Sequence, residues 1–219
     1  MKHVGIIGLG DMGIGLARNL ISSGFQLTGF DLRESRRTLL AEAGGTAADS
    51  IAQVGEAATS VFVMVLNGEQ ALAVVEELKT TLKPGSTIIV SATIEPAEVR
   101  EVADRLEGTG IQLIDTPVSG GKSGADNGTL TMMAAAKAEV LENNRDILEA
   151  VGKDIFHVGE EIGLGQTVKA SLQALIGATF TAIFESLVLG CKAGVPGRVL
   201  YEVFTSSGVR SPLLENCAK

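Results

Sequence analysis

The sequence predicts an α/β protein, with a doubly wound parallel sheet followed by a long helix and the start of an all-helical domain. Strand-like and helix-like segments alternate from His3 to Val158, which is typical of a parallel sheet with helices on both faces. A glycine turn follows the first of these strands, at Gly8, Gly10 and Gly13. After Gly163, apolar residues recur at steps of three and four, the spacing of one helical face.

Each element follows from its local pattern. The predicted strands are His3–Gly8, Gln26–Phe30, Val61–Leu66, Thr87–Ala92, Ile111–Thr116, Leu130–Ala135 and Asp154–Val158. The predicted helices of this part are Met12–Ser22, Ser35–Ala43, Glu69–Thr80, Ala97–Glu107 and Ala138–Val151. A glycine-rich loop is expected from Ser119 to Gly128.

The second part of the chain is predicted to be helical. The apolar run from Val168 to Val188 predicts one helix of roughly 25 residues, buried rather than spanning a membrane. Gly194-Val195-Pro196 ends it, and a second helix is expected to reach Thr205. We place the domain boundary near Gly163, giving a dinucleotide-binding domain over 1–163 and a partial helical domain over 164–219.

Charge and cysteine content narrow the function. The net charge is −8, and no basic cluster exceeds Arg33, Arg36 and Arg37, which we interpret as a solvated turn. No nucleic-acid partner is therefore expected. Cys191 and Cys217 have the spacing of neither a zinc site nor a disulfide framework, so no metal is predicted. The short apolar N-terminus lacks a cleavage site, and a cytoplasmic, membrane-free protein is expected.

The glycine turn predicts a dinucleotide site. Gly8-Leu9-Gly10-Asp11-Met12-Gly13 lies between a strand and a helix, the context that gives this spacing its meaning. Gly8 allows the tight turn, Gly10 lets a pyrophosphate approach the backbone, and Gly13 lets the helix lie close to the strand. Asp31 ends the second strand, where a carboxylate accepts the ribose hydroxyls of NAD and repels the 2′-phosphate of NADP. NAD is therefore the expected cofactor, although Arg33, Arg36 or Arg37 could pair with such a phosphate.

Two further patterns are candidates for a substrate site. Ser119, Gly120 and Gly121 follow a strand and offer a hydroxyl and bare N–H groups to a carboxylate, but an ordinary flexible loop explains them equally well. Lys169 and Gln173 lie one turn apart on a helical face, and apolar neighbours favour a lowered lysine pKa. On chemistry alone, a solvated lysine near a helix start is the simpler interpretation.

Together these residues resemble the β-hydroxyacid dehydrogenase family. The resemblance covers the chain from Lys2 onward and rests on four ordered motifs. They are the glycine turn, Thr93-Ile94-Glu95-Pro96, the run from Asp115 to Gly121, and Gly165-Gln166-Thr167-Val168-Lys169.

The resemblance implies a role for each matching position. It makes Lys169 the catalytic lysine and the Ser119–Gly121 turn the site of the substrate carboxylate. Leu66, Asn67 and Thr93 fall on cofactor-contact positions. It also implies that members continue past Lys219, with further helices that help close the active site.

Departures from the family pattern point to one branch. Ala92 replaces a common serine, Asn67 a common proline, and Gln173 a common asparagine. Gln173 with Leu172, and less strongly Ser206-Ser207-Gly208, resemble the branch acting on four-carbon sugar acids.

The expected function is hydride transfer between NAD and a small hydroxy acid such as L-threonate. The alternatives are a non-catalytic NAD-binding module, a reductase of a small semialdehyde acid, and an imine reductase. A homodimer or larger assembly is expected, because Phe180, Phe184 and Leu187 should lie partly exposed.

Overall fold

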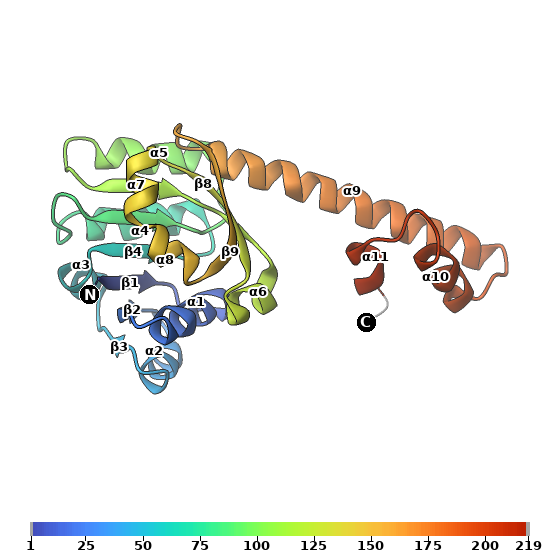
Figure 1. Ribbon diagram of the computed structural model, residues 1–219, viewed down its shortest axis with the longest axis horizontal. Helices are drawn as coiled ribbons and strands as arrows, with labels where there is room; N and C mark the ends of the chain where they lie inside the picture. Colours follow the sequence, from blue (N-terminus) through green and yellow to red (C-terminus); the bar gives the residue numbers. More distant parts are fainter. Residues whose placement is uncertain (1, 218–219) are drawn as a thin grey trace. The chain divides into compact units, whose positions relative to one another are not determined.

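The computed structural model describes residues 2–217. The chain divides into two compact units, Met1–Lys169 and Ala170–Lys219. The first is built on one nine-stranded sheet, and the second is helical (Figure 1). The domain division proposed at Gly163 falls immediately before the long helix and remains a prediction.

The sheet has the strand order of a dinucleotide-binding fold. The strands are β1 (His3–Ile7), β2 (Gln26–Phe30), β3 (Thr46–Ala47), β4 (Ser60–Val63), β5 (Thr87–Val90), β6 (Gln112–Asp115), β7 (Val118–Ser119), β8 (Leu130–Ala135) and β9 (Gly152–Gly159). Their order is β3-β2-β1-β4-β5-β6-β8-β7, and β9 pairs with β8. The six strands from β3 to β6 are parallel, whereas β8 runs antiparallel to β6. The order reverses between β1 and β4, so a ligand crevice is expected at their carboxyl ends.

Helices cover both faces of this sheet. One face carries α1 (Asp11–Ser22), α2 (Glu34–Glu42), α6 (Gly121–Asn127), α7 (Ala138–Asn143) and α8 (Arg145–Glu149). The other carries α3 (Ile51–Ala57), α4 (Gly68–Leu78) and α5 (Pro96–Leu106). The predicted doubly wound α/β fold is therefore confirmed.

Alternation along the central strands explains the two layers. Ile6 belongs to the core on the α1 side, and its neighbour Ile7 to the core on the α4 side. In the same way, Phe62 and Val63 of β4 point to opposite faces. Buried side chains of this size contribute about 1.5–3 kcal/mol each, and both faces therefore need apolar residues.

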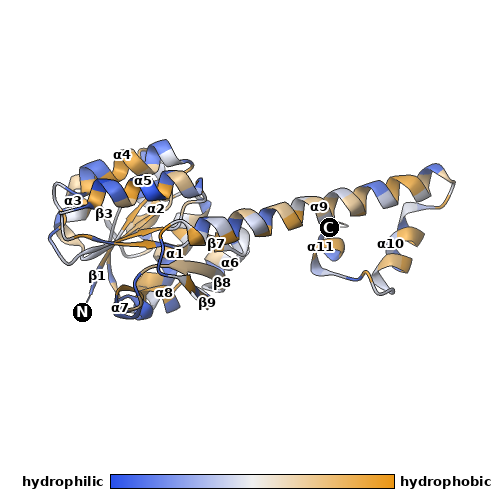
Figure 2. Cartoon of the chain, turned by 90° about the horizontal axis from the view of Figure 1, so that it is seen from above, coloured by the Kyte–Doolittle hydropathy of each residue, from blue (hydrophilic) through white to orange (hydrophobic). Residues whose placement is uncertain are grey.

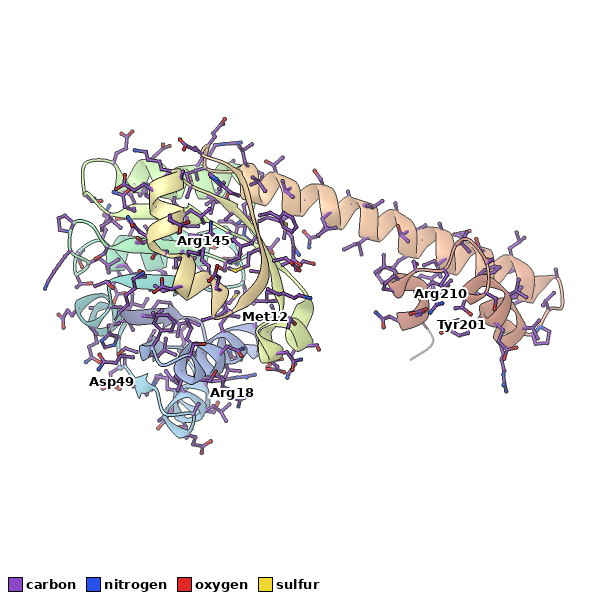
Figure 3. The ribbon with its side chains drawn as sticks, viewed as in Figure 1. Met12, Arg18, Asp49, Arg145, Tyr201 and Arg210 are labelled. Atoms are coloured by element: carbon purple, nitrogen blue, oxygen red, sulfur yellow. The ribbon has the colours of Figure 1, made fainter. Side chains whose placement is uncertain are left out.

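Two local predictions were wrong. The segment expected to be a loop from Ser119 to Gly128 contains α6. The helix expected over 138–151 is broken into α7 and α8 at Asn144; Figure 3 labels Arg145, where α8 begins. Helix α3, which Ser50 caps, was missed. Its seven residues are too few to show a clear apolar period.

Asn144 explains the broken helix. Its Oδ1 accepts a hydrogen bond from Ser60 Oγ at 2.7 Å, and its Nδ2 donates to Thr87 Oγ1 at 3.2 Å and to Val140 O at 2.9 Å. Ser60 and Thr87 begin β4 and β5. The side chain thus ties the α7–α8 turn to the amino ends of two central strands.

The second unit consists mainly of α9, α10 (Gly197–Thr205) and α11 (Pro212–Asn216). Helix α9 (Leu164–Lys192) begins in the first unit and ends before Gly194, which has φ +93°. At Gly190 an added Cβ would lie 2.6 Å from Leu200 Cδ1, so α10 packs closely on α9. Figure 3 labels Tyr201 of α10 and Arg210, which lie near one another.

Helix α9 is exposed within the described chain, which corrects the expectation of a buried helix. Only Gly165 and Gln166 of its residues are buried among 2–217, while Leu175 is 65% and Phe184 52% exposed. Apolar residues lie along much of its length (Figure 2). By length and composition α9 could cross a membrane, but one such helix is weak evidence because core helices pass the same test. Apolar spacing identifies a helix, but it cannot show what covers the helix.

Candidate active site

The glycine turn follows β1, at the carboxyl ends of the neighbouring strands β1 and β4. Gly8 has φ +93°, and a Cβ there would lie 2.2 Å from Met64 O, the residue after β4. A Cβ at Gly13 would lie 1.9 Å from Gly8 O, so α1 starts directly against the turn. Both positions require glycine.

The space at Gly10 fits a dinucleotide phosphate. Gly10 precedes α1, and the nearest atom to an added Cβ is Arg33 Nη2 at 3.9 Å. Because Gly10 has no side chain to cap the helix, N–H groups of its first turn can bind an anion. Asp11 and Met12 begin this turn, and Leu9 is fully buried beneath it; Figure 3 labels Met12.

Asp31 is buried at the end of β2 beside the same turn. Its Oδ2 accepts a hydrogen bond from Leu9 N at 2.9 Å, and its Oδ1 accepts from Arg33 N at 2.9 Å. The Arg33 side chain adds bonds from Nε at 3.0 Å and from Nη2 at 3.2 Å. Burial acts to raise the pKa of Asp31, but the hydrogen bonds from Arg33 and Leu9 outweigh it and hold the pKa below the ordinary value.

The arginines interpreted from the sequence as a solvated turn also make specific contacts. Arg33 pairs with Asp31, Arg36 pairs with Asp11 at 2.9 Å, and Arg37 Nη1 donates to Asp31 O at 2.8 Å. These bonds hold the arginines beside Asp31 and the first turn of α1, and the Arg33 side chain remains 58% exposed over the buried carboxylate.

Further cofactor candidates follow the carboxyl ends of β4 and β5. Leu66 is 86% exposed, and its N–H donates to Gln70 Oε1 at 3.0 Å. Asn67 caps α4, because its Oδ1 accepts from Gln70 N at 2.9 Å. Thr93 is exposed just beyond β5, between the buried Ala92 and Ile94. An exposed leucine beside a polar turn can cover an aromatic ring of the cofactor.

The Ser119–Gly121 turn joins β7 to α6. Gly120 and Gly121 have φ +129° and +57°, which side chains rarely tolerate. Helix α6 packs on α1, because Asn19 Nδ2 donates to Ala125 O at 2.6 Å and Gly15 lies against Ala125. The turn is thus tied to the helix that begins at the glycine site.

Lys169 lies beside this turn. Its Nζ donates a hydrogen bond to Val118 O at 2.7 Å, next to Ser119. The side chain is partly buried, and burial lowers the pKa of its ammonium below the ordinary lysine value. The structure therefore brings Lys169 and the Ser119 turn together, as a shared site requires.

Gln173 lies on α9 in the second unit and is exposed. Its role, like that of the other site residues, remains a prediction.

Sequence reasoning assigned no role to Asp115 and Gln166. Asp115 is fully buried at the end of β6, and its Oδ2 accepts from Gly163 N at 2.9 Å. Gln166 is 1% exposed and bridges Ile94 N and Ala92 O. The signal in the sequence for Asp115 was a carboxylate at the end of an apolar strand. Its hydrogen-bond partners could not be predicted, because they lie some 50 residues further along the chain.

Comparison with protein families identifies both parts of the chain. Residues 3–159 match the NAD binding domain of 6-phosphogluconate dehydrogenase, and residues 163–219 match the NAD-binding family of NADP-dependent 3-hydroxyisobutyrate dehydrogenase.

Individual proteins agree with these matches. L-threonate dehydrogenase from Escherichia coli O6:H1 is 38% identical over 98% of this chain and 72% of its own length. The crystal structure of 3-hydroxyisobutyrate dehydrogenase from Salmonella typhimurium is 33% identical with a TM-score of 0.89, over 99% of this chain and 76% of that one. The Mycobacterium tuberculosis 3-hydroxyisobutyrate dehydrogenase with L-serine is 29% identical with a TM-score of 0.90, over 97% and 73%.

The fold, the glycine turn and these relatives agree on one assignment. The NAD(P) cofactor suggested by the glycine turn is confirmed by the family matches. The chain belongs to the β-hydroxyacid dehydrogenase family and is an NAD(P)-dependent hydroxyacid dehydrogenase.

Proposed function

We propose that the protein oxidises a small four-carbon sugar acid of the L-threonate kind with NAD. The observation that carries the proposal is the position of Lys169, whose partly buried Nζ lies 2.7 Å from Val118 O beside the Ser119 turn. The chemistry needs a carboxylate site and a proton acceptor side by side, and this turn and lysine supply them.

The substrate carboxylate binds at Ser119, Gly120 and Gly121. The Ser119 hydroxyl and the glycine N–H groups are donors, and such backbone concavities bind anions. The turn is held by the contacts of α6 with α1, including the bond from Asn19 to Ala125 O. It is therefore arranged before the substrate arrives.

Lys169 accepts the proton of the substrate hydroxyl as the carbinol carbon is oxidised. Bound NAD supplies the acceptor for the hydride. Neutral lysine is needed for this step, and burial of Lys169 lowers its pKa in the required direction. Gln173, one turn further along α9, orients the substrate hydroxyl or the lysine.

The substrate class is supported by the L-threonate dehydrogenase relative and by Leu172 and Gln173. A semialdehyde acid reduced by the same site is the alternative, because the reaction is reversible.

Asp31 supports NAD as the preferred form of the cofactor. Its carboxylate lies beside the glycine turn through the bond from Leu9 N. Arg33 can leave the carboxylate when ribose hydroxyls bind, because its side chain is largely exposed. A 2′-phosphate would meet the same buried negative charge.

The test is NADH formation with L-threonate, L-serine, 3-hydroxyisobutyrate and glycerate, compared by kcat/KM. We expect L-threonate to be the best substrate. Lys169→Ala should lower kcat by about 10²–10⁴-fold, the usual contribution of a general base. Lys169→Arg should restore little, since guanidinium does not lose its proton near neutral pH.

Lys153→Ala is the matched control, because Lys153 is an exposed lysine on β9. It should leave kcat and NAD affinity unchanged. Near-normal turnover of Lys169→Ala would contradict the assignment. Loss of NAD binding together with activity would make Lys169 structural. Reduction of imines but of no hydroxy acid would favour the imine reductase alternative.

The proposal extends to assembly and location. The exposed apolar residues of α9 support a homodimer or larger assembly with this helix in the interface. A cytoplasmic location is in keeping with the two free cysteines.

A further inference from the structure

A buried carboxylate holds the first turn of α9, just ahead of Lys169. Asp115, the last residue of β6, is fully buried, and its Oδ2 accepts hydrogen bonds from Gly163 N at 2.9 Å and from Gln166 N at 3.4 Å. Helix starts leave such N–H groups without intrahelical partners. The carboxylate supplies the missing acceptor from a distant strand.

Two neighbours fix the same turn against the sheet. A Cβ added to Gly165 would lie 2.5 Å from Met133 O and 2.7 Å from Asp115 O, so the helix backbone touches β6 and β8 directly. Gln166 Nε2 donates to Ala92 O at 3.0 Å, and its Oε1 accepts from Ile94 N at 3.1 Å. These two bonds hold the turn against the segment that follows β5.

Packing alone does not explain a carboxylate at this place. Its Oδ1 is buried and has no hydrogen-bond partner within residues 2–217, an arrangement that costs free energy. Burial raises the pKa of Asp115, while the amide hydrogen bonds from Gly163 and Gln166 oppose the rise. The positive end of the helix dipole also favours the ionised form.

We propose that Asp115 is a positioning residue for Lys169, because its carboxylate locks the first turn of α9 and thereby sets Lys169 Nζ beside Val118 O. Asp115 and Val118 belong to one short segment, and both contact α9. The start of α9 is thus held first by the Asp115 carboxylate and then, at Lys169, by Val118 O. A shift of the helix at Asp115 would move Lys169 Nζ away from Val118 O. The inference rests on the proposed role of Lys169 as proton acceptor.

The experiment compares Asp115→Ala with Asp115→Asn in the whole protein. The main measurement is the pH at which Lys169 is half labelled by an amine-reactive reagent, read by mass spectrometry of its peptide. In Asp115→Ala this pH should rise, because a released Nζ becomes hydrated. The kcat should fall by roughly 10–100-fold, as expected for a misplaced catalytic group, and NAD affinity should stay unchanged.

Asp115→Asn keeps an acceptor oxygen, so its labelling pH should stay at or below that of the wild type. Both variants remove the negative charge, and that loss can only lower the lysine pKa, so a raised labelling pH in Asp115→Ala cannot come from the charge. Asn144→Ala is the matched control, because Asn144 is 4% exposed and lies at the amino ends of β4 and β5. It should lower the melting temperature without changing the labelling of Lys169.

An unchanged labelling pH and kcat in Asp115→Ala would overturn the proposal. If Asp115→Ala does not fold, the same labelling measurement is made on Gln166→Leu. This variant removes the bonds of Gln166 to Ala92 and Ile94, which hold the same turn of α9. A raised labelling pH then supports the proposal, and an unchanged one overturns it. Absence of turnover in the wild type would count against the proposed function, while the labelling experiment, which needs no substrate, would still test the positioning of Lys169.

Discussion

Replacing Gly13 by alanine tests whether the close start of α1 creates the phosphate site. The new Cβ would lie 1.9 Å from Gly8 O, whereas ordinary contact begins near 3.4 Å. The helix and the turn must therefore separate by about 1.5 Å. Overpacking of this kind costs about 1–3 kcal/mol, which lowers the melting temperature by about 2–12 °C for a unit of this size.

The same displacement should weaken NAD binding. Hydrogen bonds to a charged group are worth about 1.5–3 kcal/mol, so loss of one predicts a rise in Kd of roughly 10–100-fold. Calorimetry with NAD and thermal unfolding without it measure the two effects separately.

Gly10→Ala is the informative comparison. Gly10 has φ −61°, and an added Cβ meets nothing closer than 3.9 Å, so the melting temperature should hardly change. The methyl group would occupy the approach of the pyrophosphate, and NAD affinity should fall about tenfold or more. Gly208→Ala, where nothing lies within 4 Å of the added Cβ, should change neither quantity.

The reasoning fails if Gly13→Ala keeps both wild-type stability and affinity. It also fails if Gly10→Ala binds NAD as tightly as the wild type.

Three further predictions concern cofactor preference, pH and assembly. Asp31→Ala should bind NADP at least about tenfold more tightly, because the repelling charge is lost and Arg33 becomes available; unchanged NADP binding by calorimetry would refute this. The folded pKa of Asp31 lies below 3.8, so its stabilisation is present above that pH and is lost as the pH falls through the folded value. Asp31→Asn should accordingly have a lower urea midpoint of unfolding than the wild type at neutral pH, and the two midpoints should converge in acid. A difference between the midpoints that does not change with pH would contradict this dependence on the ionisation of Asp31. Phe184→Glu, at a side chain 52% exposed on α9, should shift sedimentation toward the monomer; an unaltered assembly would place the interface elsewhere.

Local sequence determined the elements that carry the cofactor site. The turn at Gly8, Gly10 and Gly13 could be predicted because the steric need for glycine is local to a strand, a turn and a helix. Asp31 could be predicted because it directly follows the next strand. The two-sided burial of the central strands likewise follows from runs such as Val61–Val63.

Contacts between distant segments were decided only by the tertiary structure. Leu9 N donates to the buried Asp31 carboxylate across 22 residues, and Arg36 pairs with Asp11 across 25, partners that the linear pattern does not identify. Asn144 breaks a helix because strands β4 and β5 bring Ser60 and Thr87 to its side chain.

The same is true of the site around Lys169. Its sequence neighbourhood favours a solvated lysine, yet folding places Nζ on Val118 O and places the start of its helix on Asp115. Desolvation and hydrogen bonding depend on three-dimensional neighbours, some 50 residues away along the chain. The sequence therefore determined which residues are available for the chemistry, and the tertiary structure decided which of them meet, because proximity in space sets burial, charge and proton affinity.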